Sequence, residues 1–214
     1  MSSGTADVRD ADLEVATPRV ATAIHPWWVR VTHWINVVAM LLMIMSGWQI
    51  YDASPLFPFR FPPAITIGGW LAGALLWHFA AMWLLVVNGI VYVTLGIATG
   101  RFRRKLFPIR PSDVARDLAA ALTFRLSHAD LSVYNAVQRL LYVGVIAAGV
   151  VAVVSGLSIW KPVQLQEITA LFGGYNAARY VHFFAMTAIV GFLLVHVALA
   201  ILVPKSLRAM IIGR

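Results

Sequence analysis

The sequence predicts an all-α integral membrane protein, a bundle of four transmembrane helices with both termini in the cytoplasm. Of the 214 residues, 60% are hydrophobic and only 12% are charged, and the mean hydropathy is +0.79. A soluble domain has about 25% charged residues. Four apolar segments are long enough to cross a bilayer, which takes ~20 residues. Basic residues gather beside alternate ends of these segments, as expected for chains that obey the positive-inside rule.

The four expected spans form a single membrane domain, residues 25–214. Only α-helices and closed barrels satisfy the backbone in lipid, and these segments are too long for barrel strands. Residues 1–24 are polar and mixed in charge with no apolar core, so we expect a disordered cytoplasmic tail and not a signal peptide. The spans cover residues 29–50, 66–100, 136–160 and 178–203. The second is longer than one bilayer needs, which predicts a strong tilt or a projection beyond the membrane.

The distribution of lysine and arginine predicts the orientation. Six of them lie in residues 101–116, and others flank both termini, whereas the loops 51–64 and 161–178 are poor in them. The termini and the basic loop are therefore placed in the cytoplasm, in a multi-pass membrane protein. Within that loop, residues 111–113 are typical of a helix start. Residues 114–126 then alternate apolar and charged, which favours an interfacial amphipathic helix.

Four histidines lie within the spans, and their depths match in pairs. His182 and His196 are fourteen residues apart, which brings a helix back to within about 40° of the same face, about 21 Å further along. Counting from the charged residues at the span ends puts His78 level with His182 near the outer side, and His33 level with His196 near the cytoplasmic side. Two level pairs on facing helices are what two bis-histidine haems require.

Other roles for these histidines stay open. An intramembrane histidine can hydrogen-bond a neighbouring helix or relay protons, and a metal site without porphyrin is a further alternative, although few acidic residues accompany the four. His25 and His128 have no partner at the same depth and are expected to be solvated or interfacial. Gly47 lies fourteen residues after His33, where it would let the outer porphyrin lie against the first helix or simply help helices pack.

Composition narrows the cofactors and partners. The chain has no cysteine, which excludes disulfides, iron–sulfur clusters and covalently attached haem. The net charge of +8 comes from residues that flank the spans, so it indicates contact with membrane lipid and no nucleic acid. Arg30, Arg139 and Arg179 lie at span ends, where a guanidinium would bind a haem propionate or anchor the helix at the interface.

These residues resemble the four-helix dihaem cytochrome b family. It includes bacterial cytochrome b561, the b-type subunit of nickel–iron hydrogenases and the gamma subunit of formate dehydrogenase. The resemblance extends from His25 to the end of the chain. It is carried by the string from Arg30 to Trp34 that includes His33, by His78, and by His182 with His196. It implies two b-type haems, one between His33 and His196 and one between His78 and His182.

The string from Tyr134 to Arg139 resembles one in the formate dehydrogenase gamma subunit that lies near a quinone beside the cytoplasmic haem. Asn135 and Gln138 are three residues apart and so share a helix face. Their amides would hydrogen-bond a ubiquinone or menaquinone carbonyl. Helix capping and contact with lipid headgroups are the alternatives.

The expected function is electron transfer between the membrane quinone pool and a periplasmic redox subunit. That subunit would be a hydrogenase, a formate dehydrogenase or a molybdopterin oxidoreductase, and the direction of flow is open. The first alternative is a free-standing superoxide:quinone oxidoreductase, with Lys161 and Arg179 attracting the anion. The second is a haem-free transporter or assembly factor. No catalytic residue is assigned, and a homo-oligomer is left open.

Overall fold

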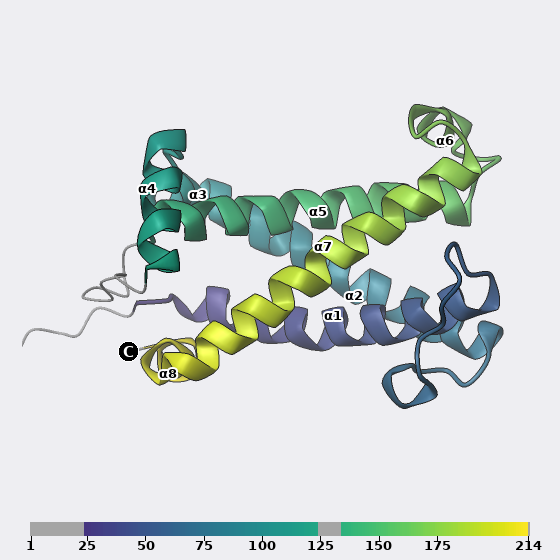
Figure 1. The fold of residues 1–214 in the computed structure, drawn as a ribbon, viewed down its shortest axis with the longest axis horizontal. Coiled ribbons are helices and arrows are strands. Elements are labelled where there is room, and N and C mark those ends of the chain that lie inside the picture. The colour runs from purple at the N-terminus through teal and green to yellow at the C-terminus, as the bar shows by residue number, and fades with distance from the viewer. Residues whose placement is uncertain (1–23, 124–133, 214) are drawn as a thin grey trace, which may run out of the picture.

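The computed structural model describes residues 24–123 and 134–213. The expected tail lies outside the described residues apart from Ile24, and so does His128. The described chain is helical almost throughout (Figure 1). In chain order the helices are α1 (Trp27–Ala53), the 3-10 turn η1 (Pro63–Ile65), α2 (Leu71–Ala98), α3 (Arg101–Leu106), α4 (Pro111–Leu122), α5 (Ala136–Trp160), α6 (Gln166–Leu171), α7 (Tyr175–Leu202) and α8 (Pro204–Ile212).

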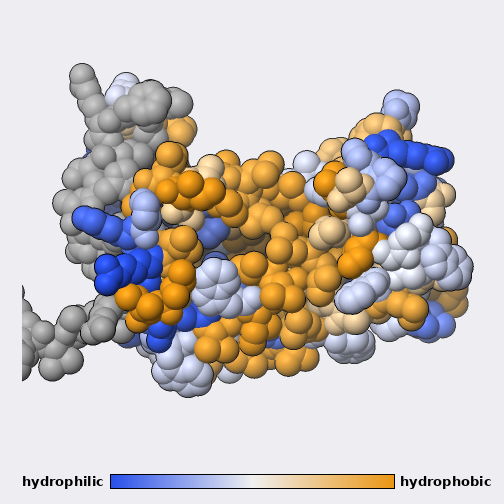
Figure 2. Space-filling view, turned by 90° about the horizontal axis from the view of Figure 1, so that it is seen from below, coloured by the Kyte–Doolittle hydropathy of each residue, from blue (hydrophilic) through white to orange (hydrophobic). Residues whose placement is uncertain are grey.

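Four of these helices, α1, α2, α5 and α7, are long and apolar enough to cross a membrane, which confirms the predicted fold class. They contain 25 to 28 residues, or about 38 to 42 Å at the rise of an α-helix. That exceeds a hydrocarbon core of about 30 Å, so tilt or protruding ends take up the difference. On the face seen in Figure 2, apolar side chains cover the middle and hydrophilic ones gather at the two ends.

The second span is shorter than expected, because two glycine turns bound it. Gly68 and Gly69 have φ angles of 106° and 70°, and α2 begins only at Leu71. A Cβ on Gly68 would stand 2.3 Å from the backbone nitrogen of Ala74. At the other end Gly100 has a φ of 63° and separates α2 from α3. Helix α2 therefore begins later than the start expected near residue 66, and it ends close to the expected residue 100.

The long helices pack as two pairs. Helix α1 packs along α2, and α5 packs along α7, whereas close Cα approaches between the two pairs are few among the described residues. Helix α7 runs diagonally across the bundle, from α6 at one end to α8 at the other (Figure 1). Because of this crossing, one helix can face different neighbours at its two ends.

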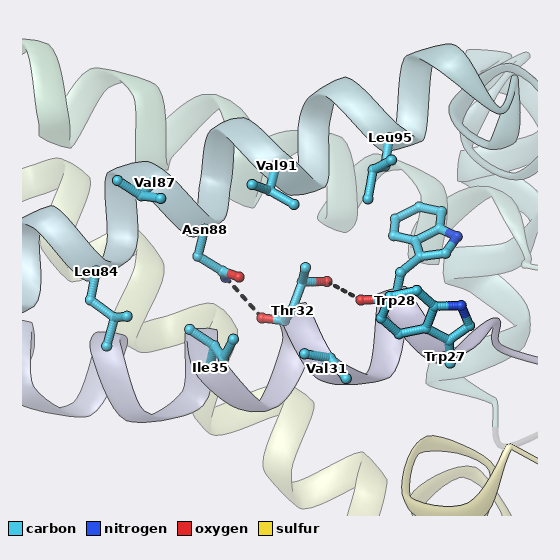
Figure 3. A pocket seen from close by; sticks show the side chains of 10 residues that line it. All are labelled: Trp27, Trp28, Val31, Thr32, Ile35, Leu84, Val87, Asn88, Val91 and Leu95. Carbon is cyan, nitrogen blue, oxygen red and sulfur yellow. Dashed lines mark hydrogen bonds between the residues drawn. The ribbon is translucent and has the colours of Figure 1, made fainter.

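A polar contact holds α1 to α2 within their apolar interface. The buried Asn88 donates from Nδ2 to the Thr32 carbonyl at 2.9 Å, and the Thr32 hydroxyl donates to the Trp28 carbonyl at 2.8 Å (Figure 3). An amide in lipid is costly unless it finds such a partner. The contact lies at the floor of a shallow apolar groove, lined by Trp27, Trp28, Val31, Thr32, Ile35, Leu84, Val87, Asn88, Val91 and Leu95.

The basic end of the bundle carries three short helices, α3, α4 and α8. The predicted amphipathic helix is present as α4, which begins at Pro111 as expected. Asp117 on α4 accepts a hydrogen bond from the Ala136 nitrogen at 2.7 Å and so fastens the start of α5. Helix α8 was not predicted. It packs beside the start of α1, where the Ile24 nitrogen donates to the Gly213 carbonyl at 2.9 Å.

Candidate functional site

The four intramembrane histidines form two pairs. These are the two pairs that the depths of the residues in the sequence predicted. The ring centroids of His78 and His182 lie 6.4 Å apart, and those of His33 and His196 lie 6.0 Å apart. The ring planes are inclined by 67° in the first pair and 65° in the second. The first pair of histidines joins α2 to α7, and the second joins α1 to α7. Both histidine pairs therefore connect the α1–α2 pair of helices with the α5–α7 pair. Whether they ligate haem stays a prediction.

The spacing of each pair fits a single metal ion held between two imidazoles. A metal–imidazole bond of about 2 Å places two ring centroids on opposite sides of the metal about 6 Å apart. In the part of the chain that the structure describes, no group of three or more histidine, cysteine, aspartate or glutamate side chains gathers as a metal site. Each pair would therefore hold a metal through two imidazole nitrogens, and a macrocycle such as haem would supply the remaining ligands itself.

Helix α1 holds the imidazole of His78 at its Nδ1 atom. Its Nδ1 lies 3.0 Å from the hydroxyl oxygen of Ser46, and that hydroxyl donates its own hydrogen to the Leu42 carbonyl at 2.5 Å. The serine oxygen is therefore left to accept from Nδ1–H. With the proton on Nδ1, the lone pair that can bind a metal is on Nε2.

The imidazole of His182 is held in the same way by α5. Its Nδ1 lies 2.9 Å from the Ala152 carbonyl oxygen and 3.2 Å from the hydroxyl oxygen of Ser155. A carbonyl oxygen only accepts, so Nδ1 carries the proton in this ring as well. Neither serine was singled out in the sequence. The available signal was a Ser-Gly step at 46–47 and another at 155–156, each inside an apolar span.

A glycine follows each of these serines and makes room for the histidine ring. A Cβ on Gly47 would lie 3.4 Å from Cε1 of His78, and a Cβ on Gly156 would lie 3.1 Å from Cε1 of His182. Of the two roles left open for Gly47, helix packing is thus present, and a contact with a porphyrin stays a prediction. The ring that lies against this glycine is the imidazole of the neighbouring helix.

The inner pair is surrounded differently. Phe192, one turn before His196 on α7, is stacked on the His196 ring, with 5.5 Å between centroids and 13° between planes. The His33 and Trp34 rings pack in a T-shaped arrangement, with 5.5 Å between their centroids. Within the described residues, no hydrogen bond to a ring nitrogen of either inner histidine is found. The outer pair is thus fixed by hydrogen bonds, and the inner pair by aromatic packing.

Asn135 and Gln138 cap the cytoplasmic start of α5. The Asn135 side chain accepts from the Gln138 backbone nitrogen at 2.7 Å, and the Gln138 side chain accepts from the Asn135 nitrogen at 3.1 Å. This is a complete capping box. Capping, one of the alternatives left open by the sequence, is therefore present. It uses the two amide oxygens, so a quinone role would fall to the amide nitrogens.

Aromatic rings connect this cap with the inner histidines. Tyr134, beside the cap, lies 5.1 Å from Tyr142 between ring centroids, and Tyr142 lies 6.2 Å from Phe192. Phe192 in turn stacks on His196. Neighbouring rings along the way are thus in contact from the start of α5 to the inner pair.

The three arginines that the sequence suggested as partners of haem propionates donate hydrogen bonds to backbone carbonyls. Arg30 donates from Nη1 to the Ile211 carbonyl of α8 at 2.9 Å, and its buried Nε has no partner among the described residues. Arg139 and Arg179 likewise donate to carbonyls of loop segments. Arg30 therefore fastens α8 to α1, and its role towards a propionate stays a prediction.

Of the two environments expected for His25, solvated and interfacial, the solvated one is wrong, because the residue is buried. Its side chain accepts at Nδ1 from Nη2 of Arg101 at 3.1 Å, and the residue is only 8% exposed. Burial, and then the positive charge of Arg101, lower the pKa of His25 to about 4. The same arginine partly offsets the effect of burial on Tyr134, whose pKa is nevertheless raised.

A family model described as prokaryotic cytochrome b561 matches residues 24–213, which include all four intramembrane histidines. The chain belongs to the prokaryotic cytochrome b561 family. A relative from Azospira oryzae, named putative protein-methionine-sulfoxide reductase subunit YedZ1, is 57% identical over 191 residues, which are 89% of this chain and 96% of the relative. Cytochromes of the b561 family bind b-type haem. This chain is thus a membrane cytochrome with several spans, located in the bacterial inner membrane.

Proposed function

We propose that this b561-family chain carries electrons across the membrane between quinone and an outward redox subunit, using two b-type haems. The observation that supports this most directly is that the four histidines form two pairs at two depths, with ring centroids 6.4 and 6.0 Å apart. Helix α7 contributes one histidine to each pair, and these two residues are about 21 Å apart along the helix. Two redox centres at this separation would cover most of the hydrocarbon core.

Haem, when bound, supplies a one-electron iron couple whose potential depends on its axial ligands and surroundings. The chain would do the rest. His78 and His182 would hold the outer group through Nε2, because their Nδ1 atoms are taken by α1 and α5. His33 and His196 would hold the inner group against the aromatic rings of Trp34 and Phe192.

We further propose that the electrons flow outwards, to a reductase subunit. The Azospira relative is named as a putative subunit of a protein-methionine-sulfoxide reductase. Reduction of a sulfoxide to a thioether takes up two electrons and two protons and releases water. Oxidation of a quinol to a quinone supplies the two electrons and releases its two protons on the cytoplasmic side, so this chain would deliver the electrons one at a time to the outward side, where the sulfoxide would take up two protons from the outer solution.

The quinol would react at the cytoplasmic start of α5. Asn135 and Gln138 lie there, with amide nitrogens that the capping box does not use. The contacting rings of Tyr134, Tyr142 and Phe192 lead from this point to His196. A quinone headgroup at the cap would therefore lie at one end of an apolar, aromatic path to the inner pair.

The superoxide:quinone oxidoreductase alternative has less support. It requires outward cations that attract an anion. The Lys161 ammonium lies 5.0 Å from the centre of the Trp160 ring, and Arg179 donates to Ser54. Both cations thus have local partners, and the named relative is a reductase subunit.

The experiment that tests the proposal uses the full chain, purified in detergent. We expect two haems per chain by pyridine haemochrome, and reduction of both when a short-chain menaquinol or ubiquinol is added. One haem or none per chain would overturn the dihaem assignment. Two haems that no quinol reduces would overturn the quinol step.

The outward partner is tested separately by co-expression with a periplasmic methionine sulfoxide reductase subunit from the same genome. Quinol-dependent reduction of a protein-bound methionine sulfoxide should require both chains. A sulfoxide reduction rate that is the same without this cytochrome would overturn the proposed partner.

A further inference from the structure

The two helices behind the outer histidines carry the same small arrangement. On α1 it consists of Ser46 and Gly47 with the carbonyl of residue 43, and on α5 of Ser155 and Gly156 with the carbonyl of residue 152. In both, the serine comes three residues after the carbonyl and the glycine four. We call each a serine–glycine cradle. The cradles come from opposite helix pairs and so hold the outer pair of imidazoles from both sides.

In each cradle the helix dictates which way the hydrogen bond runs. Ser46 donates its single hydrogen to the Leu42 carbonyl, and Ser155 donates to the Val151 carbonyl at 2.6 Å. These are bonds to the residue four positions back, a common use of serine inside a helix. Each serine oxygen therefore keeps only acceptor capacity for the imidazole, and Nδ1 must bring the proton.

A third buried serine in the same protein shows that burial alone does not bring a serine hydroxyl to an imidazole. Ser158 lies on α5 and is as fully buried as Ser46 and Ser155. Within the described residues its hydroxyl donates to the Val154 carbonyl, and its backbone carbonyl accepts from the Thr169 hydroxyl. The inner histidines have no hydrogen-bonding counterpart within the described residues. Among the described residues, buried serine hydroxyls thus contact imidazoles at the outer pair alone.

We propose that the two serine–glycine cradles position both outer imidazoles and lower the midpoint potential of the haem that they hold. A ligating imidazole that donates its other N–H to an acceptor becomes a more basic ligand, which stabilises ferric iron. Hydrogen bonding around the metal ligands is one of the means by which a protein sets a haem potential. This inference rests on the proposed function, because it needs a haem between His78 and His182.

The test is a potentiometric titration of the full chain and of Ser46→Ala, Ser155→Ala and Ser158→Ala. Haem content is measured first. In the wild type, absence of the outer haem would defeat the proposed function itself, whereas two haems let the cradles be judged on their own. The low-spin EPR signals of the two haems are recorded on the same samples, because they report the orientation of the axial rings.

We expect Ser46→Ala and Ser155→Ala to raise the midpoint potential of the same haem, to shift its EPR signal and to leave the other haem as an internal standard. The rise should be smaller in Ser155→Ala, because the Ala152 carbonyl, 2.9 Å from Nδ1 of His182, still accepts its proton. Ser158→Ala should leave both potentials where they are. Selective loss of that haem from both cradle variants, with both haems kept in Ser158→Ala, would also support the proposal. It is overturned by unchanged potentials and EPR signals in the cradle variants, or by an equal change in Ser158→Ala.

Discussion

The imidazole of His182 lies directly against Gly156, so that a Cβ on this glycine would stand 3.1 Å from Cε1 and 3.4 Å from Nδ1 of the ring. The ring is also tied to the Ala152 carbonyl, which leaves it little freedom to retreat. Gly156→Ala should therefore displace the ring and lower the haem content from two per chain towards one. Pyridine haemochrome analysis of the purified variant measures this.

Two other glycines provide controls for this substitution. Gly149 lies on the same helix, and a Cβ there would meet nothing within 4 Å. Gly149→Ala should keep both haems, and the helix gains up to about 1 kcal/mol of propensity. Gly47→Ala, with an ordinary contact of 3.4 Å to His78, should have an intermediate or small effect. Haem loss from Gly149→Ala as large as from Gly156→Ala would show that helix packing, and not the histidine contact, is responsible.

The pairing of the histidines is tested by removing one ligand from each pair. His196→Ala should lose the inner haem and largely keep the outer one, and His78→Ala should do the reverse, because each pair draws on a different helix opposite α7. Reduced-minus-oxidised spectra and pyridine haemochrome analysis should then show one haem in each variant, with different alpha bands. Retention of both haems in either variant would refute the pairing.

Two substitutions of Asn135 separate capping from quinone binding. Asn135→Asp keeps the oxygen that accepts from the Gln138 nitrogen but removes the amide nitrogen. Asn135→Leu removes both, and loss of an N-cap costs about 1 kcal/mol. If the amide nitrogen donates to a quinone carbonyl, both variants should slow haem reduction by quinol with haem content unchanged. Wild-type kinetics in Asn135→Asp, together with a lower melting temperature in Asn135→Leu, would leave capping as the sole role.

Much of the arrangement follows from one-dimensional information. Length and hydropathy determine four spans, and the rise per residue determines the height of each histidine, so the level pairing of His33 with His196 and of His78 with His182 could be predicted. The amphipathic pattern after Pro111 likewise identified α4. Each of these depends on position along one helix and on the membrane as an external reference.

What could not be predicted depends on how neighbouring helices are rotated about their axes. Height alone does not tell whether Ser155 faces His182, lipid or its own backbone, and the glycine beside it reads equally well as a packing residue. Asn88, which bonds across to Thr32, and His25, which accepts from Arg101, are further cases. Each contact joins residues far apart in sequence, so only the packed bundle reveals it.

The buried position of His25 predicts a pH dependence of stability. Its pKa is lowered by burial, and then by Arg101, to about 4 from an ordinary value of 6.5. Between these pH values the unfolded chain binds a proton that the folded chain does not, so this residue reduces the free energy of unfolding as the pH falls from 6.5 towards 4. Above 6.5 both states are neutral at this position and the contribution is flat.

His25→Gln isolates this contribution, because the glutamine oxygen can still accept from Arg101 but does not titrate. The melting temperature of the variant in detergent should fall less steeply than that of the wild type over the same pH interval, and the two should differ least near neutral pH. The other titrating groups are common to both proteins, so the difference between the two profiles reports His25. Parallel pH profiles would mean that His25 takes up its proton as readily in the folded chain as in the unfolded one, and that burial and the contact with Arg101 do not lower its pKa.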